Sequence, residues 1–422
     1  MNIYISTWFK STAFLLVLLS GLSLFGQSID STSNENKIII NRVPVDTSRE
    51  RMNMDAVYDR PFLSLNKMPV AVGGYLEANS IFSSTDGVSE GLSFQVPRLT
   101  IFMASTINKR LKFLTEIEFE EGGREINIEF AALDVMINSA FNLRGGIIMN
   151  PIGAYNQNHD GPKWEFIQRP NTATDLIGVT LSNSGFGAHG KFFKKGWVFG
   201  YEAYLTNGFD DKIIDNELNR TSLPAAKENQ ERFEESSNGQ PLYNAKIAIK
   251  NRRIGEIGFS YMGGVYNKFQ EDGVVLDDKR KMDVFAIDVN TTIRKTGTYF
   301  VGEIDFVMVE VPDTYSQQYG TNQRGVYFDV VQPILKKKVL DWDNAILNVA
   351  ARFDYVDYNI GTFRETGGDI YDDLYAVTPA VSFRPSAQTV FRINYRYEWR
   401  RDLLGNPAAK TASWLCGFST YF

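Results

Sequence analysis

The residue types that usually perform covalent chemistry are scarce in this sequence. Among its 422 residues are two histidines, His159 and His189, and one cysteine, Cys416. A nucleophilic hydrolase commonly places a histidine beside a serine or an aspartate, and no motif here supplies such a pair. A single cysteine also excludes an internal disulfide framework. We therefore expect no catalytic site and no cofactor.

Two acidic stretches, at 209–215 and 275–281, contain carboxylates that could bind a divalent cation through oxygen ligands. Neither stretch has the ligand spacing of a defined site. We interpret both stretches as solvated loop charge and expect no metal.

The regularly spaced charged residues alternate with apolar ones. In the segment 389–400, Arg392, Arg396 and Arg400 share one face, and aromatic or aliphatic residues fill the other. Such period-2 alternation is typical of a strand with two different surroundings. If such strands closed into a barrel, charges of both signs around its water-filled lumen would orient dipolar solutes and filter them by size and polarity. The same alternation supplies the other candidates for pore-lining charge: Glu116, Glu118 and Arg352.

Strand-like segments of roughly ten residues follow one another from Pro69 to the C-terminus. Their number is even, so both ends of the series lie at the same end of any closed sheet. We predict sixteen strands, at 70–80, 93–107, 111–120, 126–138, 142–148, 185–193, 197–207, 242–250, 256–266, 282–294, 299–311, 325–333, 346–358, 375–384, 389–400 and 412–422.

The connections between these segments are alternately short and long. Two connections break the rule: 121–125 is short among the long ones, and 334–345 is long among the short ones. Long loops at one end and short turns at the other are typical of a membrane-spanning antiparallel barrel. A soluble sheet would also have an apolar face, but no helical segment is present to cover it. We therefore predict an all-β transmembrane antiparallel barrel of about 16 strands over residues 69–422.

The N-terminal region has the features of an export signal. Lys10 precedes an apolar run at 13–19, and small residues follow. The run is too short for a spanning helix, so we predict a secretory signal peptide at 1–26. Residues 27–68 show no sustained period. Their "KIII" could form one strand or a docking peptide, but a periplasmic N-terminal linker is the simpler interpretation.

The chain ends on "SWLCGFSTYF", with Trp414, Cys416, Phe418 and Phe422 on one face. This resembles the C-terminal strand signature of bacterial outer-membrane proteins, which the barrel-assembly machinery recognises. The resemblance implies location in the bacterial outer membrane, contact with its lipid and lipopolysaccharide, and recognition by the assembly machinery through Phe422. With a net charge of −6, the chain lacks the basic footprint of a nucleic-acid-binding protein.

The stretch from Arg144 to Pro170 has a second resemblance. Its "RGGIIMNPIG", its closing "RP" and the flanking "FLTEIEFEEG", "IEFAALDVMIN" and "SGFGAHGKF" are similar to the phosphate-selective porin O and P family of Gram-negative bacteria. The resemblance covers most of the barrel and is sharp over 113–193. It implies a barrel that is usually a homotrimer, with loop three folded into the lumen as a constriction. It also implies these candidate constriction residues: Asn156, His159, Asp160, Lys163, Glu165 and Arg169.

The charge of the candidate loop bears on selectivity. Its basic and acidic residues nearly balance, whereas selectivity for phosphate in the resembling family rests on a basic cluster and inward arginines. We therefore expect a porin for passive diffusion of small hydrophilic solutes and ions. A substrate-specific anion channel of the phosphate type is the alternative. A different class is a barrel with a closed pore, whose long loops serve adhesion or surface binding.

Overall fold

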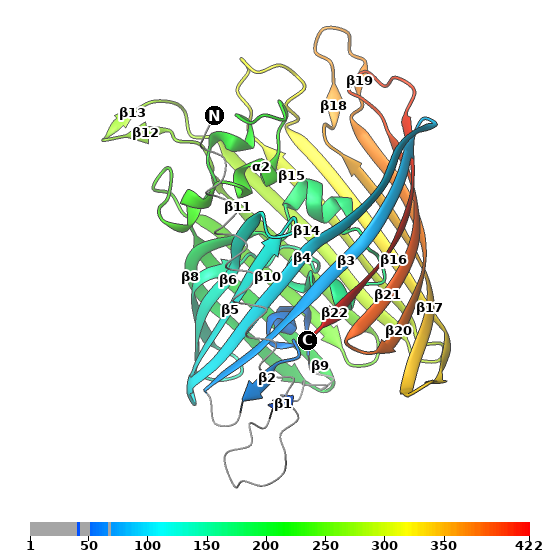
Figure 1. Cartoon of the computed structure of the whole chain (residues 1–422). Helices are drawn as coiled ribbons and strands as arrows, with labels where there is room; N and C mark the ends of the chain where they lie inside the picture. Colours follow the sequence, from blue (N-terminus) through cyan, green and yellow to red (C-terminus); the bar gives the residue numbers. More distant parts are fainter. Residues whose placement is uncertain (1–39, 43–50, 66–68) are drawn as a thin grey trace, which may run out of the picture. The chain divides into compact units, whose positions relative to one another are not determined.

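The computed structural model of the chain describes residues 40–42, 51–65 and 69–422. Over residues 70–421 the chain forms one closed antiparallel sheet of sixteen strands (Figure 1). The predicted signal peptide at 1–26 lies outside the described residues. So does most of the predicted linker, apart from 40–42 and 51–65.

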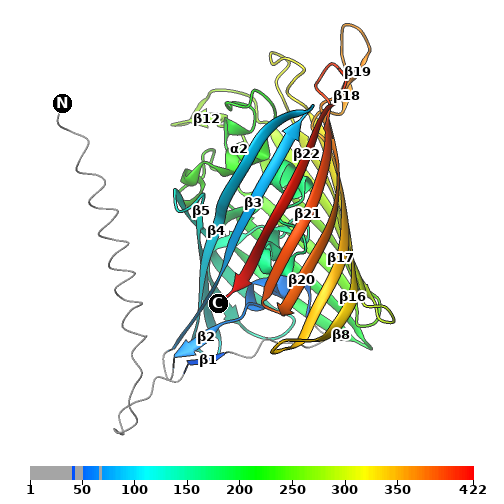
Figure 2. The same cartoon turned by 45° about the vertical axis from the view of Figure 1, so that its right-hand side comes forward.

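Each strand of the barrel pairs with its neighbours in sequence, and the last pairs with the first. β22 and β3 lie side by side in register from Thr411 opposite Thr85 to Tyr421 opposite Tyr75 (Figure 2). This seam closes the sheet, so neither strand is left with a free edge. The strands are β3 (Val70–Thr85), β4 (Val88–Asn108), β5 (Leu111–Glu120), β6 (Glu125–Met136), β7 (Asn142–Met149), β8 (Ser182–Lys194), β9 (Trp197–Thr206), β10 (Leu242–Asn251), β11 (Gly255–Val265), β14 (Lys281–Ile293), β15 (Thr298–Val309), β16 (Asn322–Val339), β17 (Trp342–Asp357), β20 (Asp373–Ser386), β21 (Thr389–Arg400) and β22 (Ala409–Tyr421).

The sixteen predicted strands are confirmed, but two predicted long connections are wrong. The stretch 81–92 continues β3 and β4, which are joined only by Asp86 and Gly87. Both residues have positive φ, 50° and 85°, as an Asp-Gly hairpin turn requires. In the same way, Leu340 and Asp341 alone join β16 to β17. The sequence predicted loops at these two places because the tips of the hairpins are polar.

The remaining elements are short. β1 (Ile40–Arg42) pairs with β2 (Leu63–Leu65), which pairs with β3. Among the described residues, no helix has both the length and the apolar character needed to cross a bilayer. The other elements are η1 (Asn53–Tyr58), η2 (Asn156–Asn158), η3 (Gly161–Lys163), η4 (Thr172–Ile177), η5 (Asp211–Ile213), α2 (Leu223–Lys227), η6 (Gln230–Phe233), β12 (Gln270–Glu271), β13 (Val274–Val275), β18 (Gly361–Thr362) and β19 (Asp369–Ile370).

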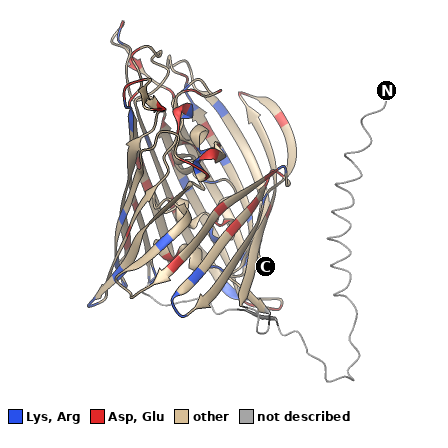
Figure 3. Cartoon of the chain, turned by 90° about the vertical axis from the view of Figure 1, so that its left-hand side faces the viewer, with Lys and Arg blue, Asp and Glu red and all other residues tan. Residues whose placement is uncertain are grey.

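The two faces of the wall differ as the alternation predicts. On β21, Phe391 and Ile393 are 47% and 51% exposed on the outside, whereas Arg392 and Asn394 are buried on the inside. Acidic and basic positions recur along the strands of the barrel (Figure 3). An apolar exterior of this kind can face hydrocarbon, while the barrel satisfies its own backbone hydrogen bonds.

A lysine on the outer face tests this assignment. We expect Ile393→Lys, near the middle of β21, to destabilise the barrel in lipid vesicles by about 2–4 kcal/mol, because the charge must leave water. Leu404→Lys is the control, because Leu404 is an exposed residue of the loop after β21. Urea unfolding in vesicles measures both variants. Equal stability of the two would contradict a lipid-facing position for Ile393.

Candidate functional site

The long connection between β7 and β8 carries most of the candidate site residues. We call residues 150–181 loop three, because it is the third connection at the end of the barrel where the long loops lie. Of its predicted constriction residues, Asn156, His159, Asp160 and Glu165 are buried, and the side chain of Arg169 is only 7% exposed. Polar groups buried to this degree need partners. Those partners are inward-facing side chains of the barrel, groups of loop three itself and Arg60 of the N-terminal segment.

The first turn of loop three is bonded to β15 and β10. The carboxylate of Glu303 accepts hydrogen bonds from the backbone N–H groups of Ala154, at 2.7 Å, and Tyr155, at 3.1 Å. The ammonium group of Lys246 donates to the carbonyl oxygen of Gly153 at 2.5 Å and pairs with Asp288 at 2.8 Å. Gly153 has φ of +60°, and a Cβ there would overlap the Glu303 carboxylate. The turn therefore depends on glycine.

The middle of loop three is bonded to β21. The Arg392 guanidinium donates to the carbonyl oxygens of Gly161, Trp164 and Phe166, the last at 2.8 Å, and pairs with Glu77 of β3 at 3.0 Å. Arg392 was predicted to line the pore. In the structure its charge is shared between a carboxylate and the backbone of loop three.

Arg352 and Arg396, the next two predicted arginines, have carboxylate partners as well. Arg352 pairs with Asp329 at 2.6 Å and donates to the carbonyl oxygen of Gln168 at 2.8 Å. Arg396 lies 3.3 Å from Asp354 and 2.8 Å from Glu398. Both arginines are inward-facing and buried. The neighbouring carboxylates largely neutralise the positive charge of both arginines.

The other predicted residues follow the same rule of opposite-charge pairing. Glu165 pairs with Arg384 at 2.7 Å, and Arg400 lies 3.5 Å from Glu398. The side chain of Arg400 is 44% exposed, so it is the most accessible of the predicted arginines. Glu118 lies 3.3 Å from Arg98 and also accepts hydrogen bonds from Tyr75 and Thr100.

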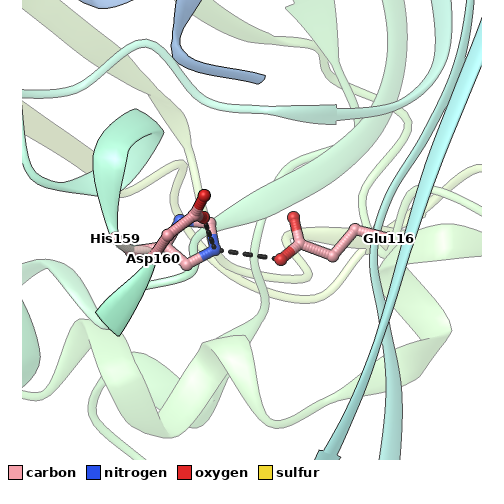
Figure 4. A group of neighbouring side chains, drawn as sticks. All are labelled: Glu116, His159 and Asp160. Atoms are coloured by element: carbon pink, nitrogen blue, oxygen red, sulfur yellow. Dashed lines mark hydrogen bonds and ion pairs between the residues drawn. The ribbon is translucent and has the colours of Figure 1, made fainter. Parts of the chain in front are cut away.

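Glu116, His159 and Asp160 come together where loop three meets β5 (Figure 4). The Nε2 atom of His159 lies 3.2 Å from Glu116, and its Nδ1 lies 2.9 Å from the carbonyl oxygen of Asn156. The guanidinium of Arg60 lies 2.8 Å from Glu116 and 2.7 Å from Asp160. The positive charge that a metal would bring is thus already supplied by an arginine.

The electrostatics of Asp160 reflect this pairing. Burial alone would raise the pKa of its carboxyl, but Arg60 and then Lys163, at 3.2 Å, hold that pKa well below its ordinary value. The hydroxyl of Tyr421 also donates to Asp160 at 2.7 Å. Asp160 is therefore an ionised anchor that joins loop three to the N-terminal segment and to β22.

Arg60 is the functional residue that sequence reasoning missed. It belongs to the described part of 27–68, the region for which we expected a linker. The spacing of residues 51–62 has no period that predicts contact with the barrel. The one local signal is an arginine followed by a proline in "YDRPF".

Cavities remain beside these contacts. One of about 320 Å³ lies where β4 and β21 meet loop three, and Arg98, Arg169 and Arg396 are among the residues that line it. The Nη2 atom of Arg169 has no hydrogen-bond partner among the described residues and lies 3.7 Å from Glu118. Three guanidinium groups and the carboxylate of Glu398 thus border one cavity beside loop three.

Removing the charge of Arg392 tests its role as a loop anchor. We expect Arg392→Gln to destabilise the folded protein by about 3 kcal/mol, because it breaks a buried ion pair and leaves carbonyl groups of loop three without their donor. The control is Arg400→Gln, which removes a half-exposed pair worth under about 1 kcal/mol. Denaturant unfolding of both variants measures the difference, and comparable losses would contradict the anchor.

Comparison with known proteins supplies one relative and a group of similar folds. No family model matches the chain. A protein of Aquifex aeolicus (strain VF5), described as uncharacterized, is 31% identical over 372 residues, which cover 83% of this chain and 80% of that protein.

Three solved outer-membrane structures share the architecture. The anion-selective porin from Comamonas acidovorans has a TM-score of 0.52 and 11% identity over 84% of this chain and 99% of that one. OmpF of Salmonella typhi has a TM-score of 0.54 and 11% identity, covering 84% and 97%. The trimer form of OmpT of Vibrio cholerae has a TM-score of 0.50 and 10% identity, covering 84% and 99%. These likenesses show that the chain shares the barrel fold of these proteins.

Proposed function

We propose, from the premise that the chain belongs to the same family as the Aquifex aeolicus protein and has the barrel fold of porins, that it is an outer-membrane porin. Small hydrophilic solutes and ions would diffuse through it down their gradients, with no cofactor and no catalytic step. The observation that carries this proposal is the closed sixteen-stranded wall with a charged interior, whose inward-facing groups are bonded to a polar loop.

Loop three is the proposed constriction. Its backbone and side chains are bonded to Glu116 on β5, Glu303 on β15 and Arg392 on β21. These strands are the third, eleventh and fifteenth of the sixteen in the barrel order. Contacts spread around the circumference in this way support a loop that folds into the lumen.

Pairing of the inward charges favours a general diffusion porin over a substrate-specific anion channel. Arg352, Arg392 and Arg396 each have a carboxylate within 3.3 Å. A solute would therefore meet dipolar ion pairs rather than a row of free cations. Such a lining selects mainly by size and polarity.

Anion preference is the second candidate, and one cavity favours it. Arg98, Arg169 and Arg396 line the cavity of about 320 Å³ beside loop three. The porin from Comamonas acidovorans is named anion-selective, and the resemblance to the phosphate-selective family points the same way. We propose phosphate-type selectivity only as this alternative.

Assembly as a homotrimer is part of the proposal. The Vibrio cholerae protein was solved in a trimer form, which supports the same state here. Phe422 donates its backbone N–H to Gly74 at 3.0 Å, so the terminal residue lies at the closing seam. Recognition of this strand by the barrel-assembly machinery, and contact of the outer surface with lipopolysaccharide, remain proposals.

Single-channel recording tests the proposed function. The protein, refolded and inserted in a planar bilayer under a KCl gradient, should give stepwise openings. The reversal potential then ranks general diffusion against anion preference. Absence of any conductance from protein shown to be folded would remove the porin proposal and favour the closed, surface-binding alternative.

Charge reversal at Arg169 tests the anion alternative. We expect Arg169→Glu to shift the reversal potential toward cation preference, because the guanidinium lines the cavity beside loop three. Arg124→Glu makes the same charge change on a side chain that is 81% exposed in the connection between β5 and β6. Equal shifts in both variants, or no shift in Arg169→Glu, would contradict a role for Arg169 in ion selection.

A further inference from the structure

The N-terminal segment 51–62 lies inside the barrel at the end where the short turns are. In Figure 1 it is the blue turn seen through the lower part of the wall. It contacts inward-facing residues near the short-turn ends of β8, β9, β10, β11 and β14. Neither the proposed diffusion pathway nor loop three accounts for a second segment at this mouth.

Polar contacts fix the first half of the segment. The backbone N–H of Asn53 donates to Glu256 of β11 at 3.0 Å, and its side-chain amide donates to Asp288 of β14 at 3.2 Å. The carboxylate of Asp55 pairs with Lys191 of β8 at 2.5 Å. The segment is thereby bonded to three separate strands of the mouth.

Apolar contacts reinforce this position. Met52 and Met54 are buried against Val198 of β9 and Ala248 of β10. A Cβ on Gly200 would come within 2.8 Å of the Met54 sulfur and 3.0 Å of the Met52 sulfur. Because Gly200 has no side chain, the barrel wall leaves space there for the two methionines to pack.

The second half of the segment is bonded to β7 and to loop three. Arg144 donates to the hydroxyl of Tyr58 at 2.8 Å. Arg60 bonds Asp160 through two nitrogens, at 2.7 Å and 3.1 Å, and also pairs with Glu116. Segment 51–62 and loop three thus form one connected structure inside the barrel.

The segment separates two cavities. One of about 540 Å³ is lined by residues that include Lys163, Lys250 and Tyr421. The other, of about 450 Å³, is lined by residues that include Lys112 and Lys191. Arg51 and Asp59 border both cavities, so the segment lies between them.

We propose that segment 51–62 divides the short-turn mouth of the pore into two branches and sets a second size limit there, in series with loop three. This inference rests on the proposed porin function. Each branch is narrower than the undivided mouth would be, and pore width is a main determinant of which solutes pass.

Deletion of residues 51–59 tests the proposal while keeping Arg60 and its pairs with loop three. We expect the deletion to raise single-channel conductance by at least about two-fold and to admit larger sugars in vesicle-swelling assays, because the mouth is no longer divided. The control deletes nine exposed residues, 270–278, from the loop at the opposite end of the barrel. Heat-modifiable gel mobility verifies that both variants are folded.

A point variant provides an independent test. Asp55→Lys places two like charges together at Lys191, so the segment should leave the mouth, and trypsin should then cleave after Arg51. Adding Lys191→Asp restores an opposite-charge pair and should return both conductance and protease resistance to the parent values. Cleavage and conductance unchanged by Asp55→Lys would contradict the proposed anchoring.

The outcomes separate this inference from the proposed function. A higher conductance in the 51–59 deletion alone supports the divided mouth. Equal conductance in parent and deletion overturns the inference and leaves the porin proposal standing, as does an equal rise in both deletions. If the parent and both folded deletion variants all fail to conduct, the porin proposal itself is overturned.

Discussion

The structure depends on closure of the backbone hydrogen-bond network at the seam between β22 and β3. In hydrocarbon no water is present to satisfy a free N–H or C=O group, so a sheet can cross only if it has no open edge. The pairing from Thr411 with Thr85 to Tyr421 with Tyr75 removes that edge. Closure also fixes which side chains of the wall face inward, and hence which wall groups loop three can contact.

Inside the wall, charge is organised by local pairing. Removing an ion from water is expensive unless an opposite charge or several hydrogen bonds replace the solvent. Arg352 with Asp329, Arg392 with Glu77 and Arg60 with Asp160 meet this requirement. The same pairs hold loop three in place, so the groups that make the barrel interior polar also fix the position of this loop.

The fold could be predicted from the sequence because strand periodicity is a local property. The alternation of apolar and charged residues, as in Phe391, Arg392 and Ile393, identifies both the strand and its two faces. The partners of Arg392 could not be predicted, because Glu77 on β3 and the carbonyl groups of loop three all lie more than two hundred residues earlier in the chain. Arg60 was missed for a related reason: residues 51–62 have no repeating pattern, and their position is specified only by groups on distant strands. By contrast, the dipeptide Asp86–Gly87 is itself typical of a two-residue hairpin turn, so this turn could have been predicted from the sequence.

The position of Arg60 has a thermodynamic consequence. One guanidinium bonds Glu116 of the wall and Asp160 of loop three, while its own backbone belongs to segment 51–62. Two elements that share a partner are energetically coupled, and such coupling is reciprocal. Loosening the N-terminal segment must therefore weaken the hold on loop three by the coupling free energy, and displacing loop three must weaken the hold on the segment by the same amount. If segment 51–62 and loop three both narrow the pore as proposed, the shared Arg60 makes them one cooperative unit, and a force on the chain ahead of residue 51 would also act on loop three.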